Sequence, residues 1–342
     1  MKKLVIKDIA RRAGVSESAV SKVINNYDDI SEKTKEKIQK IIEKLNYRPS
    51  KSAQILRKGK TNTIAFMSGR IASHFTVEIL SAIERNTFIT GKYVHGIIPY
   101  STNYEKEKMY EIFDKILYGR ETDAVIALAM NPDLKIITKY KKAKVPLILI
   151  ENDMKDAHSV NIDNHKAGFM AAEYLIKKGR KKIGLICGGL QEGTRFGYSY
   201  AAEQRKAGFE AALKKYGIKF DNRYLELCEH YTIEEGMELF ENFIKKGIKL
   251  DAIFCASGDN TAVGVMDKAK KYGMKIPNDL AVVGFDDLMY AAFFNPPLTT
   301  IRQPIDKIGS AVLNTAIEAI DKKLKSFKHI IIEPELIIRS SA

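Results

Sequence analysis

The sequence has few of the residues that build disulfide frameworks and metal sites. Its 342 residues include only three cysteines and six histidines. Cys187, Cys228 and Cys255 are odd in number and each lies in or beside an apolar run, which argues against a disulfide framework and a thiolate metal site. No two histidines have the helical spacing of a metal-binding pair. We therefore expect no metal ion and no cofactor.

Long hydrophobic runs and catalytic motifs are also lacking. No apolar run approaches the length of a membrane span, and Lys7 and Asp8 come too early for a secretory signal. The G-x-S-x-G, G-x(4)-G-K-[ST] and G-x-G-x-x-G patterns do not occur where a strand meets a helix. We therefore expect a cytoplasmic protein that does not bind membranes and is not an enzyme.

What the sequence does have is an excess of positive charge near its N-terminus. The formal net charge is +14, and residues 1–60 hold 16 Lys or Arg against 7 Asp or Glu, a balance of +9. Such an excess favours a polyanionic partner such as nucleic acid. The alternative is a generally lysine-rich composition with no particular partner. The length favours a small domain followed by a larger, bilobed one.

Three short amphipathic helices around one small core are predicted in the first fifty residues. Apolar residues recur at i, i+3, i+4 and i+7 from Ile6 to Ala13. Ser16 is a suitable N-cap for a second helix over about 17–25, and Ser31 for a third. A short helix in second position is typical of a major-groove reader, although a packing module is the alternative for this pattern.

Four strings in this region recur together in one known family. They are IKDIA at 6–10, AGVS at 13–16, VSKVIN at 20–25 and LNYRP at 45–49. Together they resemble the headpiece of the lactose/galactose repressor family, whose second helix lies in the major groove. The resemblance implies a DNA-binding helix-turn-helix headpiece.

The resemblance assigns roles to the polar half of the second helix. It implies that Glu17, Ser18 and Lys22 read base edges. Contacts to phosphate or groove are implied for three further residues, Ser16, Ser21 and Asn25. Lys22 stands where the family usually has arginine, so a bidentate grip on guanine is replaced by a single contact. Val5 replaces the usual threonine cap, so the first helix is expected to fray.

Residues 50–60 are too short and too polar to be stably helical alone. They are similar to the family's hinge helix, which folds on specific DNA and pairs with its dimer mate in the minor groove. The resemblance implies that Leu56 wedges between base steps and that Ala53 allows the two hinge helices to approach. A flexible linker is the alternative.

Beyond Thr63, short apolar runs alternate with helical patterns. This is typical of parallel sheets covered on both faces, and two groups of runs indicate two lobes. The runs occupy 63–68, 93–98, 123–128 and 146–150 in the first group, and 182–187, 251–255 and 280–284 in the second. Signatures such as PLTTIRQP at 297–304 resemble the family's effector domain, which is similar to bilobed periplasmic sugar-binding proteins.

The predicted fold class is therefore an all-α helix-turn-helix headpiece plus an α/β bilobed domain like the periplasmic binding proteins, with two doubly wound parallel sheets. The resemblance implies three crossings between the lobes. The predicted boundaries are 1–49 for the headpiece, 50–60 for the hinge, 61–160 and 303–328 for the N-terminal effector-binding lobe, and 161–302 and 329–342 for the C-terminal lobe.

Doubly wound sheets bind ligands beyond the carboxyl ends of their strands. The resemblance places six effector-binding residues there: Phe75, Thr76, Glu151, Arg205, Asp259 and Asp286. Carboxylates and a guanidinium accept from or donate to hydroxyls, and an aromatic ring offers a stacking face. These types suit a carbohydrate, with a nucleobase as the alternative. Phe75 could instead be core, and Glu151 and Asp259 could be solvated loop or cap residues.

We interpret the chain as a sequence-specific transcriptional regulator that acts as a repressor. The resemblance implies a homodimer on a pseudo-palindromic double-stranded DNA operator, controlled by a small-molecule effector between the lobes. No leucine-heptad tail follows the last signature, so a dimer is expected. The rivals are a solute-binding protein for transport and an architectural DNA-binding protein whose large domain only dimerises.

Overall fold

The computed structural model describes residues 4–24, 27, 29–47, 60–91, 96–190 and 198–342. The chain divides into two compact units, and the boundary between them in the sequence falls between Thr61 and Asn62. Each unit has a hydrophobic core of its own. The two are therefore described separately.

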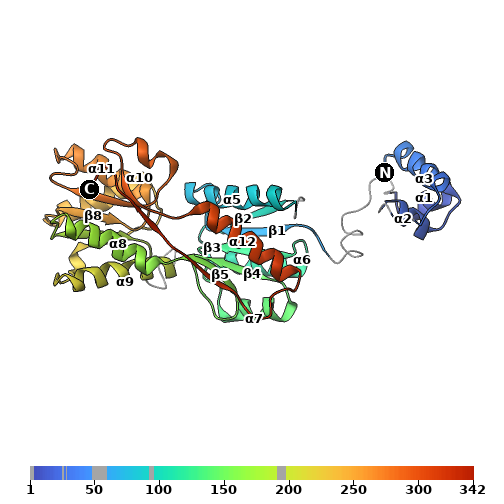
Figure 1. The fold of residues 1–342 in the computed structure, drawn as a ribbon, viewed down its shortest axis with the longest axis horizontal. Helices are drawn as coiled ribbons and strands as arrows, with labels where there is room; N and C mark the ends of the chain where they lie inside the picture. The colour runs from blue at the N-terminus through green and yellow to red at the C-terminus, as the bar shows by residue number, and fades with distance from the viewer. Residues whose placement is uncertain (1–3, 25–26, 28, 48–59, 92–95, 191–197) are drawn as a thin grey trace. The chain divides into compact units, whose positions relative to one another are not determined.

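The first unit contains three helices, labelled at the blue end of the chain in Figure 1. They are α1 (Ile6–Ala13), α2 (Glu17–Ile24) and α3 (Glu32–Lys44). Ile9, Val20 and Ile38 are fully buried, one from each helix, and form the centre of a shared core. Tyr47 closes this core, and burial raises the pKa of its hydroxyl. The three predicted helices are thus confirmed.

The helix starts follow the predicted capping chemistry at two of three positions. Ser16 Oγ accepts a hydrogen bond from the Ala19 backbone N–H at 3.1 Å, and Ser31 Oγ caps α3 in the same way. Val5 has no hydroxyl to offer at the start of α1. The Asp8 carboxylate instead accepts from the Val5 N–H at 3.1 Å, which supplies the other half of a capping box.

The second unit begins with a six-stranded parallel sheet in the order β11-β5-β4-β3-β1-β2. Helices α5 (His74–Thr90) and α12 (Ile305–Ile320) cover one face, and α6 (Lys106–Gly119) and α7 (Leu134–Ala143) cover the other (Figure 1). The strands are β1 (Ile64–Ser68), β2 (Ile97–Ser101), β3 (Ala124–Leu128), β4 (Leu147–Ile150), β5 (His158–Ile162) and β11 (His329–Ile332).

A second six-stranded sheet follows in the order β12-β10-β9-β8-β6-β7. It is covered by α8 (Asn164–Lys177) and α9 (Tyr200–Lys215) on one face and by α10 (Ile233–Lys245) and α11 (Asp259–Lys271) on the other. The strands are β6 (Ile183–Cys187), β7 (Leu225–Leu227), β8 (Ala252–Cys255), β9 (Ala281–Asp286), β10 (Thr299–Arg302) and β12 (Glu335–Ile337); two 3-10 helices, η1 (Asn222–Tyr224) and η2 (Met289–Phe293), connect them.

The continuous apolar runs arise because both faces of each sheet are buried. In β1, Ile64 and Phe66 pack toward α5 and α12, whereas Ala65 and Met67 pack toward α6 and α7. All four side chains are fully buried. The predicted fold class is confirmed, with the one difference that β12 pairs antiparallel to β10 at the edge of the second sheet.

Some predicted boundaries differ from the structure. Residues 329–332 were expected in the C-terminal lobe, but β11 pairs with β5 through His329 and Ser159 and so belongs to the first sheet. The final crossing therefore lies between β11 and β12. The first helix of this unit, α5, begins at His74 because Ser73 Oγ accepts from the Thr76 N–H at 3.3 Å. The run expected at 93–98 forms β2 at Ile97–Ser101, and 92–95 lie outside the described residues.

Two kinds of feature are absent from the described part of the chain. No helix there is long and apolar enough to cross a membrane. Nor do three His, Cys, Asp or Glu side chains come together there as a metal ion would require.

Candidate functional site

The described polar residues predicted to contact DNA lie along α2 and just before it. Ser16, Glu17 and Ser18 are exposed, and Ser21 and Lys22 are half-buried. The apolar residues of the same helix, Val20 and Val23, are buried in the headpiece core. The helix therefore presents a polar side that a DNA groove could accept. Three other residues predicted to contact DNA, Asn25, Ala53 and Leu56, lie outside the described residues.

Lys22 has a partner that the sequence did not suggest. Its ammonium group forms an ion pair with the Asp29 carboxylate, which follows α2 in the chain. The Lys22 side chain is 38 % exposed and that of Asp29 is 56 % exposed, so solvent screens the pair and it adds little stability. Lys22 must exchange this carboxylate for a base edge before it can read DNA.

A cavity of about 340 Å³ lies between the two sheets of the second unit. Its walls include loops that follow β1, β4, β8 and β9, as expected for the carboxyl ends of parallel strands. All six residues predicted to bind the effector line this cavity: Phe75, Thr76, Glu151, Arg205, Asp259 and Asp286. The structure thus brings together residues separated by more than two hundred positions.

Arg205 is the most heavily bonded of these residues. Its Nε donates to Asn164 Oδ1 at 2.7 Å and its Nη1 donates to the Ala256 carbonyl at 2.9 Å. Its Nη2 forms an ion pair with Glu151, so α9 of the second lobe is joined to the loop after β4 of the first. The guanidinium also stacks 3.7 Å from the centre of the Phe285 ring. This network fixes the guanidinium plane beside the cavity.

Asp259 and Asp286 are the two carboxyl groups of the second-lobe wall. Asp259, at the start of α11, accepts from Thr300 Oγ1 at 2.6 Å and from the Leu288 N–H at 2.8 Å. Burial raises the pKa of Asp259 to about 7, and burial together with the neighbouring Asp259 raises the pKa of Asp286 well above its ordinary value. Gln303 Nε2 donates to Asp286 Oδ1 at 2.7 Å. A protonated Asp286 could both donate to and accept from a ligand hydroxyl.

Gly258 explains how Asp286 reaches this position. A Cβ on Gly258 would lie 3.1 Å from Asp286 Oδ2. The φ of Gly258 is also +128°, which side-chain-bearing residues rarely adopt. The absence of a side chain at Gly258 therefore leaves room for the Asp286 carboxyl group.

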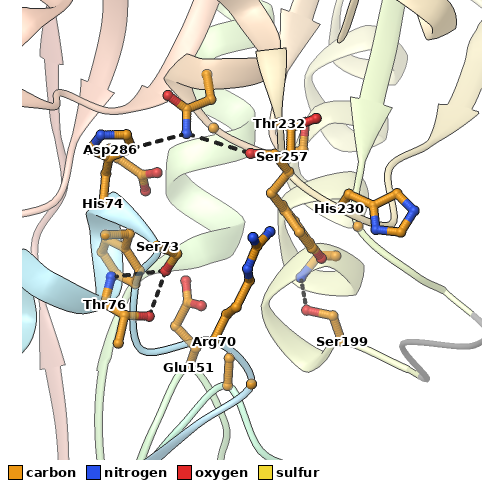
Figure 2. Close-up of a pocket in the computed structure, with 18 of the residues that line it drawn as sticks. Arg70, Ser73, His74, Thr76, Glu151, Ser199, His230, Thr232, Ser257 and Asp286 are labelled. Carbon is orange, nitrogen blue, oxygen red and sulfur yellow. Dashed lines mark hydrogen bonds between the residues drawn. The ribbon is translucent and has the colours of Figure 1, made fainter. Parts of the chain in front are cut away.

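The first-lobe wall is built around the start of α5. Thr76 Oγ1 accepts from Ser73 Oγ at 2.7 Å and lies 3.1 Å from Ser68 Oγ (Figure 2). Phe75 lines the cavity but is half-buried and packs against the main hydrophobic core, so it is partly a core residue, which was the alternative interpretation of it.

Several lining residues were missed by sequence reasoning. Arg70 lies two residues after the end of β1, so the rule that placed Phe75 could have found it. Tyr231 could not be found in that way, because its loop has no motif and is shaped by the buried Glu235, whose carboxylate accepts the backbone N–H groups of three consecutive residues. The other polar lining residues missed are Ser68, Ser73, His74, Tyr104, Tyr198, Ser199, His230, Thr232, Glu234, Ser257 and Asn260.

A second link between the lobes lies at the cavity wall. His74 of α5 packs edge-on against Tyr290 of the second lobe, with ring centres 5.2 Å apart. Tyr290 Oη donates to Asn260 Oδ1 at 2.5 Å, and Asn260 Nδ2 lies 3.5 Å from His74 Nδ1. This contact and the Glu151–Arg205 ion pair both join the two lobes at the cavity. The shape of the cavity therefore depends on the relative position of the lobes.

Comparison with known proteins identifies the two units. Residues 5–50 match the family model of bacterial regulatory proteins of the lacI family, and residues 172–342 match that of a periplasmic binding protein-like domain. The transcriptional regulator RegA of Clostridium saccharobutylicum is 32% identical over 338 residues, which are 98% of each chain. The chain belongs to the lacI family.

Solved structures of lacI-family proteins share the fold. The Lac repressor dimer bound to operator and the anti-inducer ONPF has a TM-score of 0.83, with 24% identity over 99% of each chain. A lacI-type regulator from Alkaliphilus metalliredigens QYMF, complexed with D-xylulofuranose, has a TM-score of 0.70 and 25% identity over 82% of this chain and 99% of that one.

This membership settles the broad class of the protein. It is a DNA-binding transcriptional regulator with a ligand-binding domain, and it is not an enzyme. The predicted lactose/galactose repressor resemblance is therefore confirmed.

Proposed function

We propose that this lacI-family protein is a repressor that binds a pseudo-palindromic operator as a homodimer and responds to a polyhydroxylated effector in the cavity between its lobes. In this proposal Glu17, Ser18 and Lys22 read base edges. Ser16, Ser21 and Asn25 contact the backbone or groove, and the 50–60 hinge enters the minor groove through Ala53 and Leu56.

The observation that carries the effector proposal is the meeting of Glu151, Arg205 and Asp286 at one cavity (Figure 2 shows Glu151 and Asp286). Fixed carboxyl and guanidinium groups offer directional bonds to the hydroxyls of a sugar, and Phe75 offers an apolar face. The sugar bound by the Alkaliphilus relative supports the same ligand class. A nucleobase carries fewer hydroxyl groups than a sugar for these carboxyl and guanidinium groups to bind.

The dimer proposal draws support from exposed apolar side chains of the second unit. Phe88 and Ile89 near the end of α5 are 76 % and 79 % exposed, and Met289 and Phe293 of η2 are 81 % and 83 % exposed. Clusters of exposed large apolar residues mark interaction surfaces. The Lac repressor relative is a dimer on its operator, and a two-fold dimer reads a two-fold sequence.

The interlobe contacts suggest how effector and DNA are coupled. Ligand in the cavity would compete for Glu151 and Arg205 and would alter the His74 contact with Asn260, so it would favour one separation of the lobes. It can shift the equilibrium only by the difference between its affinities for the two states. The sign of the response therefore depends on which state holds the hinge pair together.

The proposal is tested by binding the full chain to a library of randomised palindromic duplexes while carbohydrates and purines are titrated. We expect one preferred operator, an affinity that falls steeply with salt, and one carbohydrate that changes it. Asp286→Ala should keep operator binding and lose the response. A variant that responds like the parent would show that the cavity is not the effector site.

Lys22→Ala tests the headpiece in the same assay. We expect a loss of about 1–3 kcal/mol on the preferred operator and a smaller loss on duplexes altered at the base that Lys22 reads. Lys33→Ala on α3 is the matched control for charge. Equal loss on every duplex would make Lys22 a backbone contact, and a parent chain with no preference over random DNA would overturn the function.

A further inference from the structure

Arg70 is a charged residue of the cavity that the proposed contacts do not use. It lies two residues beyond the end of β1, is exposed and lines the cavity. Figure 2 shows its side chain reaching into the cavity, on the same side as Glu151. The ion pairs found among the described residues do not include Arg70, although they involve many of the other charged side chains there, Arg205 among them.

The other strong charges deep in the cavity are already balanced. Arg205 pairs with Glu151, and its remaining nitrogens donate to Asn164 and Ala256. Burial raises the pKa of both second-lobe carboxyl groups, Asp259 and Asp286, so they carry less negative charge at neutral pH than ordinary aspartates would. The positive charge of Arg70 is therefore not cancelled by these groups.

The surroundings of Arg70 suit an anion with hydroxyl groups. The 17-residue helix α5 begins four residues after it, so the positive end of the helix dipole lies on the same wall. Ser257 Oγ, on a residue only 8 % exposed, lines the cavity and has no hydrogen-bond partner among the described residues. A buried hydroxyl without a partner is costly unless a ligand or water satisfies it.

We propose that the effector of this cavity carries an acidic group, either carboxylate or phosphate, on its polyhydroxylated body, and that Arg70 binds this group. The inference rests on the proposed function in that the cavity is taken as the effector site. A guanidinium is suited to both acids, since its N–H groups match two oxygens at once. In this proposal Asp286 and Arg205 bind the neutral part of the ligand.

The test compares matched compounds by calorimetry on the full chain. The probes are glucose, xylose and cellobiose, each as the neutral sugar, the sugar acid and the monophosphate. We expect at least one acid or phosphate to bind more tightly than its neutral parent, with an affinity that falls as salt rises. Comparison of the acid and phosphate arms separates the two sources of the charge.

Variants assign the charge to its residue. Arg70→Gln should weaken the acidic probe on the order of 10- to 100-fold and leave its neutral parent unchanged, and Arg70→Lys should restore part of the loss. Glu234→Gln is the matched control, because Glu234 is also a charged lining residue without an ion pair among the described residues. This control should bind the acidic probe as well as the parent chain or better.

Three outcomes overturn the inference. They are binding by neutral probes alone, binding by no acidic probe, and equal losses in Arg70→Gln and Glu234→Gln. Failure of this inference is distinguishable from failure of the proposed function. If a neutral sugar changes operator affinity, the proposed function is supported and the inference of an acidic group is contradicted. If the parent chain shows no operator preference, the proposed function is contradicted, whatever the sugars do.

Discussion

The side chains that start α2 are exposed, whereas two charged residues of the second-lobe wall of the cavity, Arg205 and Asp259, are buried. Glu17 and Ser18 stand in solvent, but Arg205 is 7 % exposed and Asp259 is fully buried. The first pair lies in consecutive positions of one helix. The second pair comes from different elements and is held by bonds within the protein.

This difference indicates how a substitution acts on binding and on stability in each unit. The exposed side chains at the start of α2 take no part in the headpiece core, so a substitution there should leave the fold almost intact. At the cavity Arg205 and Glu151 join the two lobes, and in the proposed function they also bind the ligand, so a substitution there should change both stability and ligand binding. Three predictions address this contrast, beginning with the substitution of largest effect.

Arg205→Met should be the most damaging change. It leaves Glu151, whose side chain is 15 % exposed, without its cation, and breaking a buried pair in this way costs about 3–5 kcal/mol. Urea unfolding followed by far-UV circular dichroism measures the loss, since the chain has no tryptophan to report by fluorescence.

The double variant Arg205→Met with Glu151→Met separates charge from packing. Because it removes both ions, it should be more stable than the single variant. Lys206→Ala, on the same helix, is the control and should lose less than about 1 kcal/mol, because its pair with Glu210 is partly exposed. A single variant as stable as this control would contradict the structural role of Arg205.

The second prediction concerns pH. The pKa of Asp259 is about 7 in the folded chain, against 3.8 for an unperturbed aspartate, so folding takes up a proton between these limits. Stability should therefore fall as pH rises across this interval, by at most about 1.4 kcal/mol per pH unit for this group.

Asp259→Asn removes the titration. At pH 5 the variant should be less stable than the parent, because its amide cannot accept from both Thr300 and Leu288. The gap should then narrow toward pH 8 as the parent loses stability. Thermal unfolding at four pH values between 5 and 8 measures it, and a gap that stays constant would show that Asp259 does not titrate in this range.

The contrast also explains what the sequence could predict. The headpiece was predicted almost completely, because its helix periodicity, its caps at Ser16 and Ser31 and its polar face are local patterns. The parallel sheets were predicted because doubly buried strands are continuous apolar runs. Short strands such as β7 and β12 were not predicted, since three residues carry no recognisable period.

The cavity was predicted only as far as the family resemblance and the strand-end rule reach. These gave Glu151, Arg205 and Asp286, but not Tyr231, whose position depends on the buried carboxylate of Glu235. The boundary at 329 was wrong because pairing of β11 with β5 is a tertiary contact with no local signal. The ion pair of Lys22 with Asp29 could not be predicted either, because no pattern in the sequence indicates it.

The smallest expected effect tests the exposed side of the comparison. Asp29→Asn frees Lys22 from its ion pair, and since the pair is screened by solvent, operator affinity should rise by less than about 1 kcal/mol while stability barely changes. Fluorescence anisotropy on the preferred operator measures the change, which should disappear in a Lys22→Ala background. A gain that persists without Lys22 would mean that Asp29 acts by repelling the DNA backbone, and the ion pair would then have no part in base reading.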